Sequence, residues 1–278
     1  MKAELDLNGL DGPFTGSGPA PIWRIDLFGG LRVNRGREVL DRFRSRTALR
    51  LLAYLAFYPG RHSRDRLAEI LWPDASLDRA RRSLSTDYSS LRHLLEPDGV
   101  GDGAVLILDS QRVGIQARAV STDVSRLETA LRAARLSTDP EMLLLIAAEQ
   151  YRGPLLGGLD DGWALHERAR LENLCYAALL ELIDLAQARN DNQSAIRHAW
   201  AARILAPARE PAYRKLMQMH ALRDEPTAVS QVYRDLERTL RTERLDGPSE
   251  QTLSLLSDLT LRPPAPRTRA SAPTVHSV

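Results

Sequence analysis

The stretch that decides the fold is DRARRSLSTDYSSLRHLL, residues 78–95, which has the pattern of an amphipathic helix. Its apolar residues fall within one narrow stripe when successive positions are placed about 100° apart around a helical axis. That stripe consists of Ala80, Leu84, Tyr88, Leu91 and Leu95. Pro97 follows two residues later, and proline does not continue a helix. The stretch is therefore predicted to be a helix that packs one face against a core.

The opposite face of this helix carries arginine and small hydroxyl residues, with Asp87 on its flank. Candidate DNA contacts on or beside this face are Arg79, Arg81, Arg82, Ser85, Thr86, Ser89, Arg92 and His93. Arginine reads the O6 and N7 atoms of guanine, and serine or threonine can contact base edges or phosphates. The face favours a helix that lies in a major groove, and an ordinary solvated helix face is the alternative.

A small sheet and two further helices are predicted before this stretch. Alternating apolar residues and turn residues predict antiparallel strands between Ile22 and Leu40. A helix from Thr47 to Tyr58 ends at a Pro-Gly pair. Ser63 is expected to cap a second helix, which ends at Trp72 before a proline.

Two short apolar runs follow the central helix, at 105–108 and 113–115, with the turn Asp109-Ser110-Gln111 between them. They predict a β-hairpin, with Arg112 at its tip. A sheet, three helices and a hairpin in this order predict a winged helix-turn-helix domain over residues 21–117. The hairpin is then the wing, and Arg112 can reach a minor groove or a phosphate.

This module resembles an OmpR-type winged helix, and more closely the N-terminal domain of the Streptomyces antibiotic regulatory protein (SARP) family. The segments that carry the likeness are Leu27-Phe28-Gly29-Gly30, Arg46-Thr47-Ala48-Leu49, 63–69, 71–74, 80–85 and 91–97. The resemblance implies that 78–95 is the recognition helix. It also implies that the loop at 72–78 faces RNA polymerase holoenzyme, through Trp72, Pro73, Asp74 and Asp78. Polar residues near the helix starts are further candidates for DNA-backbone contact, namely Arg46, Thr47, Ser63 and Arg64.

Residues 120–261 are predicted to be all-helical and TPR-like, with no strand. The expected helices span about 123–136, 139–151, 161–189, 193–205, 210–222, 225–241 and 249–260. Ala195, Ala199 and Ala202 fall at the small packing positions of a repeat, and Ala228 follows Ala195 at close to the TPR period. The region resembles the bacterial transcriptional activator domain of SARP proteins through Tyr151-Arg152-Gly153-Pro154-Leu155-Leu156, Trp163 and Glu167-Arg168. Its groove could serve a partner, a ligand or the neighbouring domain.

Charge supports this division only weakly. Residues 22–116 hold 16 Arg against 12 acidic residues, a net charge of +4, while residues 117–261 hold 18 basic against 21 acidic residues, a net charge of −3. Only Lys2 and Lys215 are lysines, so nearly all the basic residues are arginines. A GC-rich genome explains this usage as well as phosphate recognition does.

Enzyme, metal and membrane functions find no support in the sequence. Cys175 is the only cysteine and is expected to be a packed core thiol, and the six histidines are scattered without metal-site spacing. No cofactor motif or nucleophile–base set is present. Asp160-Asp161 is interpreted as a helix N-cap, and Trp163 as a packing residue. A flexible leader at 1–20, a disordered tail at 262–278 and a cytoplasmic location are expected.

The resulting prediction is a transcriptional activator that binds tandem repeats in double-stranded promoter DNA as a homodimer. Half-sites about one helical turn apart would put neighbouring protomers on the same side of the DNA. Control of a secondary-metabolite (antibiotic) gene cluster is implied by the resemblance alone. The alternative is a TPR-type adaptor whose winged helix serves protein interaction.

Overall fold

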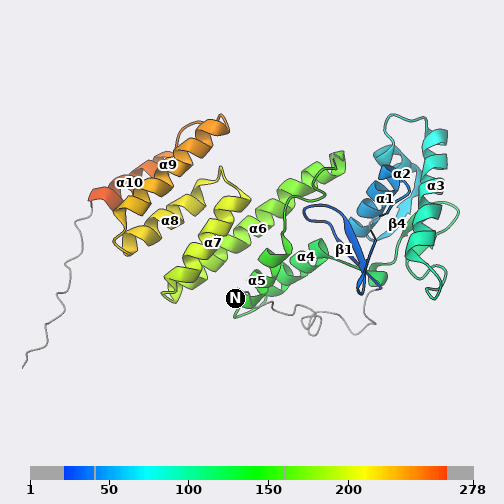
Figure 1. The fold of residues 1–278 in the computed structure, drawn as a ribbon, viewed down its shortest axis with the longest axis horizontal. Coiled ribbons are helices and arrows are strands. Elements are labelled where there is room, and N and C mark those ends of the chain that lie inside the picture. The colour runs from blue at the N-terminus through cyan, green and yellow to red at the C-terminus, as the bar shows by residue number, and fades with distance from the viewer. Residues whose placement is uncertain (1–21, 41, 160, 262–278) are drawn as a thin grey trace, which may run out of the picture. The chain divides into compact units, whose positions relative to one another are not determined.

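The computed structural model describes residues 22–40, 42–159 and 161–261 (Figure 1). The expected leader, 1–20, and the expected tail, 262–278, lie outside the described residues. Within the described residues, no helix is both long enough and apolar enough to cross a membrane.

The fold is mainly α with small β-sheets, as the sequence predicts. It divides into two compact units, one up to Ala178 and one from Leu179. The division lies within the long helix α6, Gly162–Ala188. The expected boundary between a winged helix and a helical domain, at 117–120, therefore falls inside the first unit. That these two regions have separate functions stays a prediction.

The first unit begins with a four-stranded sheet in the order β3-β2-β1-β7. Its strands are β1 (Trp23–Asp26), β2 (Arg32–Arg35), β3 (Glu38–Leu40) and β7 (Val120–Thr122). The first three form the expected antiparallel meander, and β7 pairs in parallel with β1, with Trp23 opposite Val120. The prediction that 120–261 contains no strand is wrong at this point. Three residues that lead directly into a helix are too few to show a period-two pattern.

Asp123, the first residue of helix α4 (Asp123–Ala134), fixes this helix to the sheet. Its carboxylate accepts the backbone N–H groups of Leu27, at 2.8 Å, and of Phe28, at 2.9 Å. The side chain is buried, and burial raises the pKa of Asp123 against the opposing effect of these hydrogen bonds. The bonds join residues almost 100 positions apart, so the start of the helical region is part of the first unit.

A glycine-containing loop adds a second connection between these parts. The N–H of Gly29 donates to the carbonyl of Pro154 at 2.9 Å, and the N–H of Leu156 donates to the carbonyl of Leu27 at 2.7 Å. Gly29 has a φ of +72°, and a Cβ there would lie 3.2 Å from the carbonyl oxygen of Arg152. The close approach of the two backbones therefore requires glycine at this turn.

Three helices pack on the sheet, at positions close to those expected. They are α1 (Arg46–Phe57), α2 (Arg64–Leu71) and α3 (Leu77–Leu95). The indole N–H of Trp23 in β1 donates to the carbonyl of Leu95 at 2.9 Å, which holds the end of α3 against the sheet. Leu51, Leu52, Leu84 and Leu91 are fully buried in the core between these elements.

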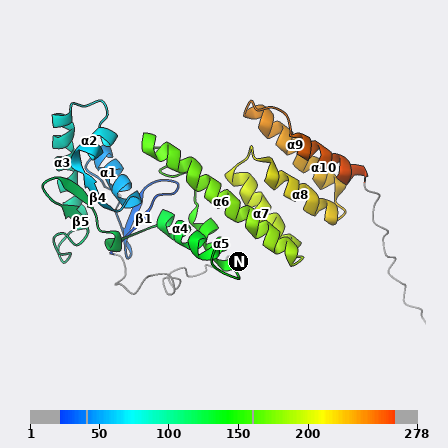
Figure 2. The same ribbon diagram turned by 180° about the vertical axis from the view of Figure 1, so that it is seen from behind.

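A three-stranded sheet in the order β4-β6-β5 forms the wing (Figure 2). β5 (Leu106–Leu108) and β6 (Arg112–Ile115) are the expected hairpin, and β4 (Gly60–Ser63) pairs antiparallel with β6. β4 was not expected, because apolar and polar residues do not alternate in Gly-Arg-His-Ser. Ser63 stands at the N-cap position of α2, but its side chain makes no capping bond, contrary to expectation.

The helices after β7 follow the predicted series within two residues at each end. In chain order they are α4 with α5 (Glu141–Gln150), α6, α7 (Asn192–Leu205), α8 (Glu210–Leu222), α9 (Pro226–Thr242) and α10 (Glu250–Leu261). A single 3-10 turn, η2 (Ala117–Ala119), precedes β7. Asn190, with a φ of 58°, takes the left-handed position at the end of α6 where a TPR usually has glycine.

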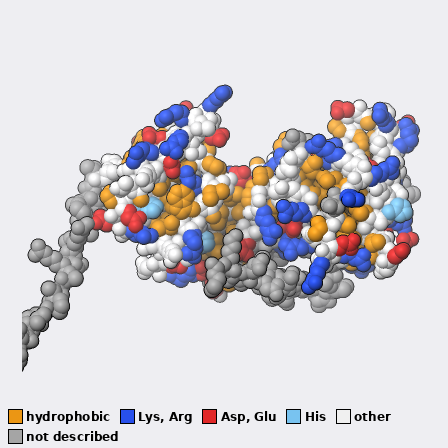
Figure 3. Space-filling model, viewed as in Figure 1, with side chains coloured by type: hydrophobic (Ala, Val, Ile, Leu, Met, Phe, Trp, Pro, Cys, Tyr) orange, Lys and Arg blue, Asp and Glu red, His pale blue; other side chains and the backbone are white. Residues whose placement is uncertain are grey.

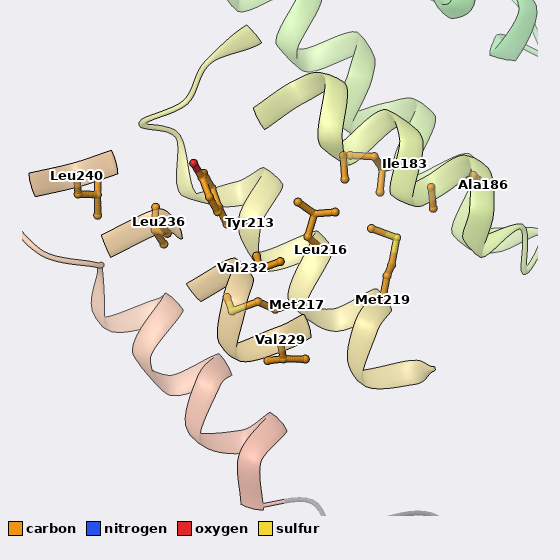
Figure 4. Packing of buried hydrophobic residues seen from close by; sticks show 12 residues of the cluster. Ile183, Ala186, Tyr213, Leu216, Met217, Met219, Val229, Val232, Leu236 and Leu240 are labelled. Carbon is orange, nitrogen blue, oxygen red and sulfur yellow. The ribbon is translucent and has the colours of Figure 1, made fainter. Parts of the chain in front are cut away.

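The core of the second unit contains small alanine side chains and two methionines among larger aliphatic residues. Ala195 and Ala199 of α7 are fully buried, as is Ala202, so the predicted small packing positions are confirmed. Figure 4 shows Leu216 of α8 directed toward Ile183 of α6. Small residues on α7 let neighbouring helices approach closely, which is how a TPR-like array forms its core.

We predict that Asp123→Ala lowers the free energy of unfolding by roughly 2–5 kcal/mol, because two buried N–H groups lose their acceptor. Urea unfolding followed by circular dichroism measures this change. Asp98→Ala removes an exposed carboxylate of the same unit and should change stability by less than about 0.5 kcal/mol. Equal stability of the two variants would contradict the role of Asp123.

Candidate nucleic-acid interface

The burial of α3 confirms the orientation of the helical wheel. Ala80, Leu84, Tyr88, Leu91 and Leu95 are all buried. The exposed residues include the five that were expected to point outward, namely Arg79, Arg82, Thr86, Ser89 and His93. Figure 3 shows Lys and Arg side chains, in blue, along the end of the first unit that carries α3, with acidic side chains between them. That these side chains contact DNA stays a prediction.

Asp87 differs from the expectation that it lies on the flank of the exposed face. Its side chain is buried at 5 % exposure and accepts hydrogen bonds from the hydroxyls of Ser45, at 2.9 Å, and Thr47, at 2.5 Å. The wheel could not show this, because both partners lie about 40 residues earlier. Asp87 therefore joins α3 to the start of α1, and its carboxylate is largely withdrawn from solvent.

The same contacts change the interpretation of two candidates for DNA-backbone contact. The Thr47 hydroxyl is bonded to Asp87, so Thr47 supports α3, and its contact with the DNA backbone stays a prediction. The N-cap of α1 is Ser45, whose Oγ accepts the N–H of Ala48 at 2.9 Å. Arg46 is exposed, and its guanidinium donates to the carbonyl of Gly158 at 3.1 Å.

A surface pocket of about 280 Å³ lies between α3 and the start of α1. It is lined by Thr47, Arg79, Arg82, Ser83, Thr86 and Asp87. Neither Arg79 nor Arg82 forms an ion pair with any residue that the structure describes. Two guanidinium groups one helical turn apart, beside hydroxyl groups, can bind a phosphate or the edge of a base.

Two other arginines on α3 do have acidic partners. Arg81 forms two hydrogen bonds with Asp65 of α2, at 2.7 and 2.8 Å, and lies 3.8 Å from Asp78. The hydrogen bond from Arg81 lowers the pKa of Asp65. Both side chains of this pair are about half exposed, and such ion pairs contribute little to stability. Arg81 can therefore exchange its partner for a phosphate.

Arg92, whose contact with DNA stays a prediction, has two acidic partners in the structure. Its guanidinium lies 3.3 Å from Glu96 and 2.9 Å from Asp102. Glu96 in turn accepts the N–H groups of Val105, at 2.9 Å, and Leu106, at 2.8 Å, at the start of the wing. Arg92 thus connects the end of α3 to the wing hairpin. This partner set depends on the loop conformation, which the helical pattern does not report.

Arg64 and Ser85 are brought together, although the sequence separates them by 21 residues. The Arg64 guanidinium donates to Ser85 Oγ at 2.6 Å, and the Arg64 backbone N–H donates to the carbonyl of Gln111 at 3.1 Å. At the wing turn, Asp109 Oδ1 accepts the N–H of Arg112 at 2.6 Å, and the Arg112 side chain is exposed. The start of α2 therefore links α3 to the tip of the wing.

The loop expected to face RNA polymerase lies between α2 and α3. Pro73, Asp74 and Asp78 are exposed, and Trp72 is half-buried. The N–H of Ala75 donates to the carbonyl of Trp72 at 3.1 Å, which closes a turn. The turn presents acidic side chains at the surface beside the start of α3.

Sequence reasoning missed the contacts that join α1 to α6. Asp161 stands directly before α6, where its carbonyl accepts the N–H of Leu165 at 3.2 Å, as expected of an N-cap. Its carboxylate also forms an ion pair with Arg50 of α1, which was not expected, and Asp160 lies outside the described residues. Trp163 packs against Tyr54, at 5.2 Å between ring centroids, and against Phe57, at 5.4 Å, which confirms it as a packing residue. No local signal could have identified these pairs, because more than 100 residues separate the partners.

Cys175 in α6 is buried, and burial raises the pKa of its thiol to about 12. A thiol with this pKa is almost entirely protonated at neutral pH and is a poor nucleophile. The expectation that Cys175 is a packed core residue is confirmed.

Comparisons with known proteins agree with this geometry. The sequence profile of the family described as bacterial transcriptional activator domain matches residues 117–258, about half of the chain. No curated protein gives a significant match. Mycobacterium tuberculosis EmbR, solved in complex with a low affinity phosphopeptide, has a similar fold, with a TM-score of 0.66 and 20 % sequence identity. The match covers 86 % of this chain but only 65 % of the EmbR chain.

We predict that Asp87→Ala lowers the free energy of unfolding by about 2–4 kcal/mol, because two hydroxyl groups lose hydrogen bonds to a charged acceptor. Thermal or urea unfolding measures the effect. The matched control is Asp78→Ala, which removes an exposed acid in the first turn of the same helix and should cost less than about 1 kcal/mol. If the exposed position proves as costly as the buried one, Asp87 does not hold α3 to α1.

Proposed function

The chain belongs to the bacterial transcriptional activator domain family, and on that premise we propose that it is a sequence-specific, DNA-binding activator of transcription. The family match and the fold identify a SARP-type transcriptional regulator. In this proposal α3 lies in the major groove of promoter DNA, the wing contacts the backbone beside it, and the loop between α2 and α3 recruits RNA polymerase.

The observation that carries the proposal is the composition of the exposed face of α3. Arg79 and Arg82 are exposed and form no ion pair with a described residue. Asp87 lines the same pocket, but its side chain is buried and accepts hydrogen bonds from Ser45 and Thr47. The major groove is about 12 Å wide and admits one α-helix with its side chains. Thr86 and Ser89 are small enough to let the helix approach the base edges closely. A solvated face without function has no need to bury its acidic residue.

The operator in this proposal consists of tandem repeats about one helical turn apart, bound by two copies of the chain. Each copy places one α3 in one major groove, so both lie on the same side of the duplex. Control of a secondary-metabolite gene cluster is proposed from the resemblance to SARP regulators.

Polymerase contact is assigned to the loop with Trp72, Pro73 and Asp74 and to Asp78 in the first turn of α3. The support is its position, because it precedes α3 directly and presents acidic groups that no tertiary contact requires. A basic surface on the polymerase would complement it.

We predict that Arg82→Ala weakens specific DNA binding by roughly 1–3 kcal/mol and relaxes sequence preference, because a bidentate contact to a base is lost. A gel-shift titration with the DNA upstream of the chain's own gene, at several salt concentrations, measures both effects. Arg132→Ala removes an exposed arginine from α4 and serves as the control, with unchanged affinity expected.

Unchanged binding by Arg82→Ala would show that this face does not read bases. Failure of the wild-type chain to bind any promoter DNA at low salt would reject the proposed function. It would favour the alternative of a TPR-type adaptor.

We predict that Asp74→Ala reduces transcription severalfold in a reconstituted promoter assay while leaving DNA affinity unchanged, since Asp74 lies on the polymerase-facing loop and not on α3. Asp139→Ala, an exposed acidic position between α4 and α5, should leave both quantities unchanged. Parallel loss of transcription and DNA binding in Asp74→Ala would place the loop in the DNA interface instead.

A further inference from the structure

The strand β4, which the sequence did not predict, brings an additional arginine to the wing. β4 pairs with β6 so that Arg61 stands opposite Gly114 and Ser63 stands opposite Arg112. Side chains alternate between the two faces of a sheet, so Arg61, Ser63 and Arg112 share one face. The other face carries Val113, which is buried. Arg61 and Arg112 are therefore both on the solvent face of the wing.

The two guanidinium groups occupy diagonal positions on neighbouring strands. Such positions lie about 7–8 Å apart, within reach of long side chains. Residue 114, directly opposite Arg61, is glycine, so no side chain stands at that position of the face. Both arginines are exposed, and neither forms an ion pair with a described residue.

The electrostatics of the wing turn agree with this placement. Hydrogen bonds from the backbone of Gln111 and Arg112 lower the pKa of Asp109, and the charges of Arg61 and Arg112 lower it further. The side chains of both arginines thus lie close enough to the turn to act on one carboxylate. Asp109 uses Oδ1 to hold the turn through backbone N–H groups, so it shapes the wing tip.

Arg64 fixes this surface relative to α3. Its backbone N–H is bonded to the carbonyl of Gln111 in the wing turn, and its guanidinium is bonded to Ser85 on α3. The cations of the wing and those of the helix therefore keep a constant separation. A surface that binds the sugar-phosphate backbone beside a helix in the major groove needs this rigidity.

We propose that Arg61 is a DNA-backbone contact that acts together with Arg112, so that the wing binds phosphate with cations from two strands. The inference rests on the proposed function. Arg61 lies within strand β4 and not at the turn of the hairpin, so we assign it to phosphate oxygens and not to base edges within a groove. The contact is independent of sequence and adds affinity and orientation.

The test measures DNA affinity of the full chain against salt concentration for the wild type and Arg61→Ala. The probes are a duplex selected by the wild type from a random library and a scrambled duplex of equal length. Each phosphate contact contributes about 0.9 to the slope of log K against log salt for B-DNA. We expect Arg61→Ala to reduce the slope by about that amount and to weaken binding by the same factor on both duplexes. Arg61→Lys, which keeps the positive charge, should restore the slope even if the alanine variant is less stable.

Arg66→Ala is the matched control. Arg66 is an exposed arginine of α2, outside the β4-β6-β5 sheet, and its charge lowers the pKa of Tyr54 in α1 against the larger raising effect of burial. Its removal should leave the slope unchanged. A wild-type slope retained by Arg61→Ala overturns the proposal, and so does a loss of affinity confined to the selected duplex, which would indicate a base contact. Absence of DNA binding by the wild type rejects the proposed function itself.

Discussion

The position of the proposed reading helix depends on the hydrogen bonds that Ser45 and Thr47 donate to Asp87. They join α3 to the first turn of α1 and hold the Asp87 carboxylate, which is only 5 % exposed, at the base of the pocket that Arg79 and Arg82 also line. Hydrogen bonds to a charged group contribute about 1.5–3 kcal/mol each, so this pair is a sizeable part of the stability of a domain. Asp87 therefore determines both the orientation of α3 and the charge of its exposed face.

Side-chain contacts also join α1 and the first sheet to the helices that follow. Arg50 pairs with the buried Asp161 at the start of α6, and Tyr58 donates to Glu167 one to two turns later. Asp123 and β7 attach α4 to the first sheet. The winged helix and the first helices after it are consequently one body, although their sequences resemble two separate modules. An event that displaces the first turns of α6 would therefore act on the helix that holds α3.

The sequence could predict those parts of the fold in which apolar or small residues recur at a regular spacing. The apolar stripe of α3 identified its buried residues, and small alanines identified the packing face of α7. The pattern failed where a strand has no alternation of apolar and polar residues, as in β4 (Gly60–Ser63) and β7 (Val120–Thr122). The pattern also does not show whether a polar side chain faces solvent or forms a hydrogen bond with a residue that is distant in the sequence. Asp87 accepts hydrogen bonds from Ser45 and Thr47, and Asp161 pairs with Arg50, so in each case the partner comes from an element that is distant in the sequence.

The most direct test of the account places a DNA-cleaving iron chelate on α3. The buried thiol of Cys175 has a pKa of about 12, so in Ser89→Cys the new thiol on the exposed face is the one that reacts with the reagent. The account predicts that the labelled protein, bound to its operator, cuts both strands around the major groove of each half-site. Intact DNA under conditions where the labelled protein remains bound would contradict it.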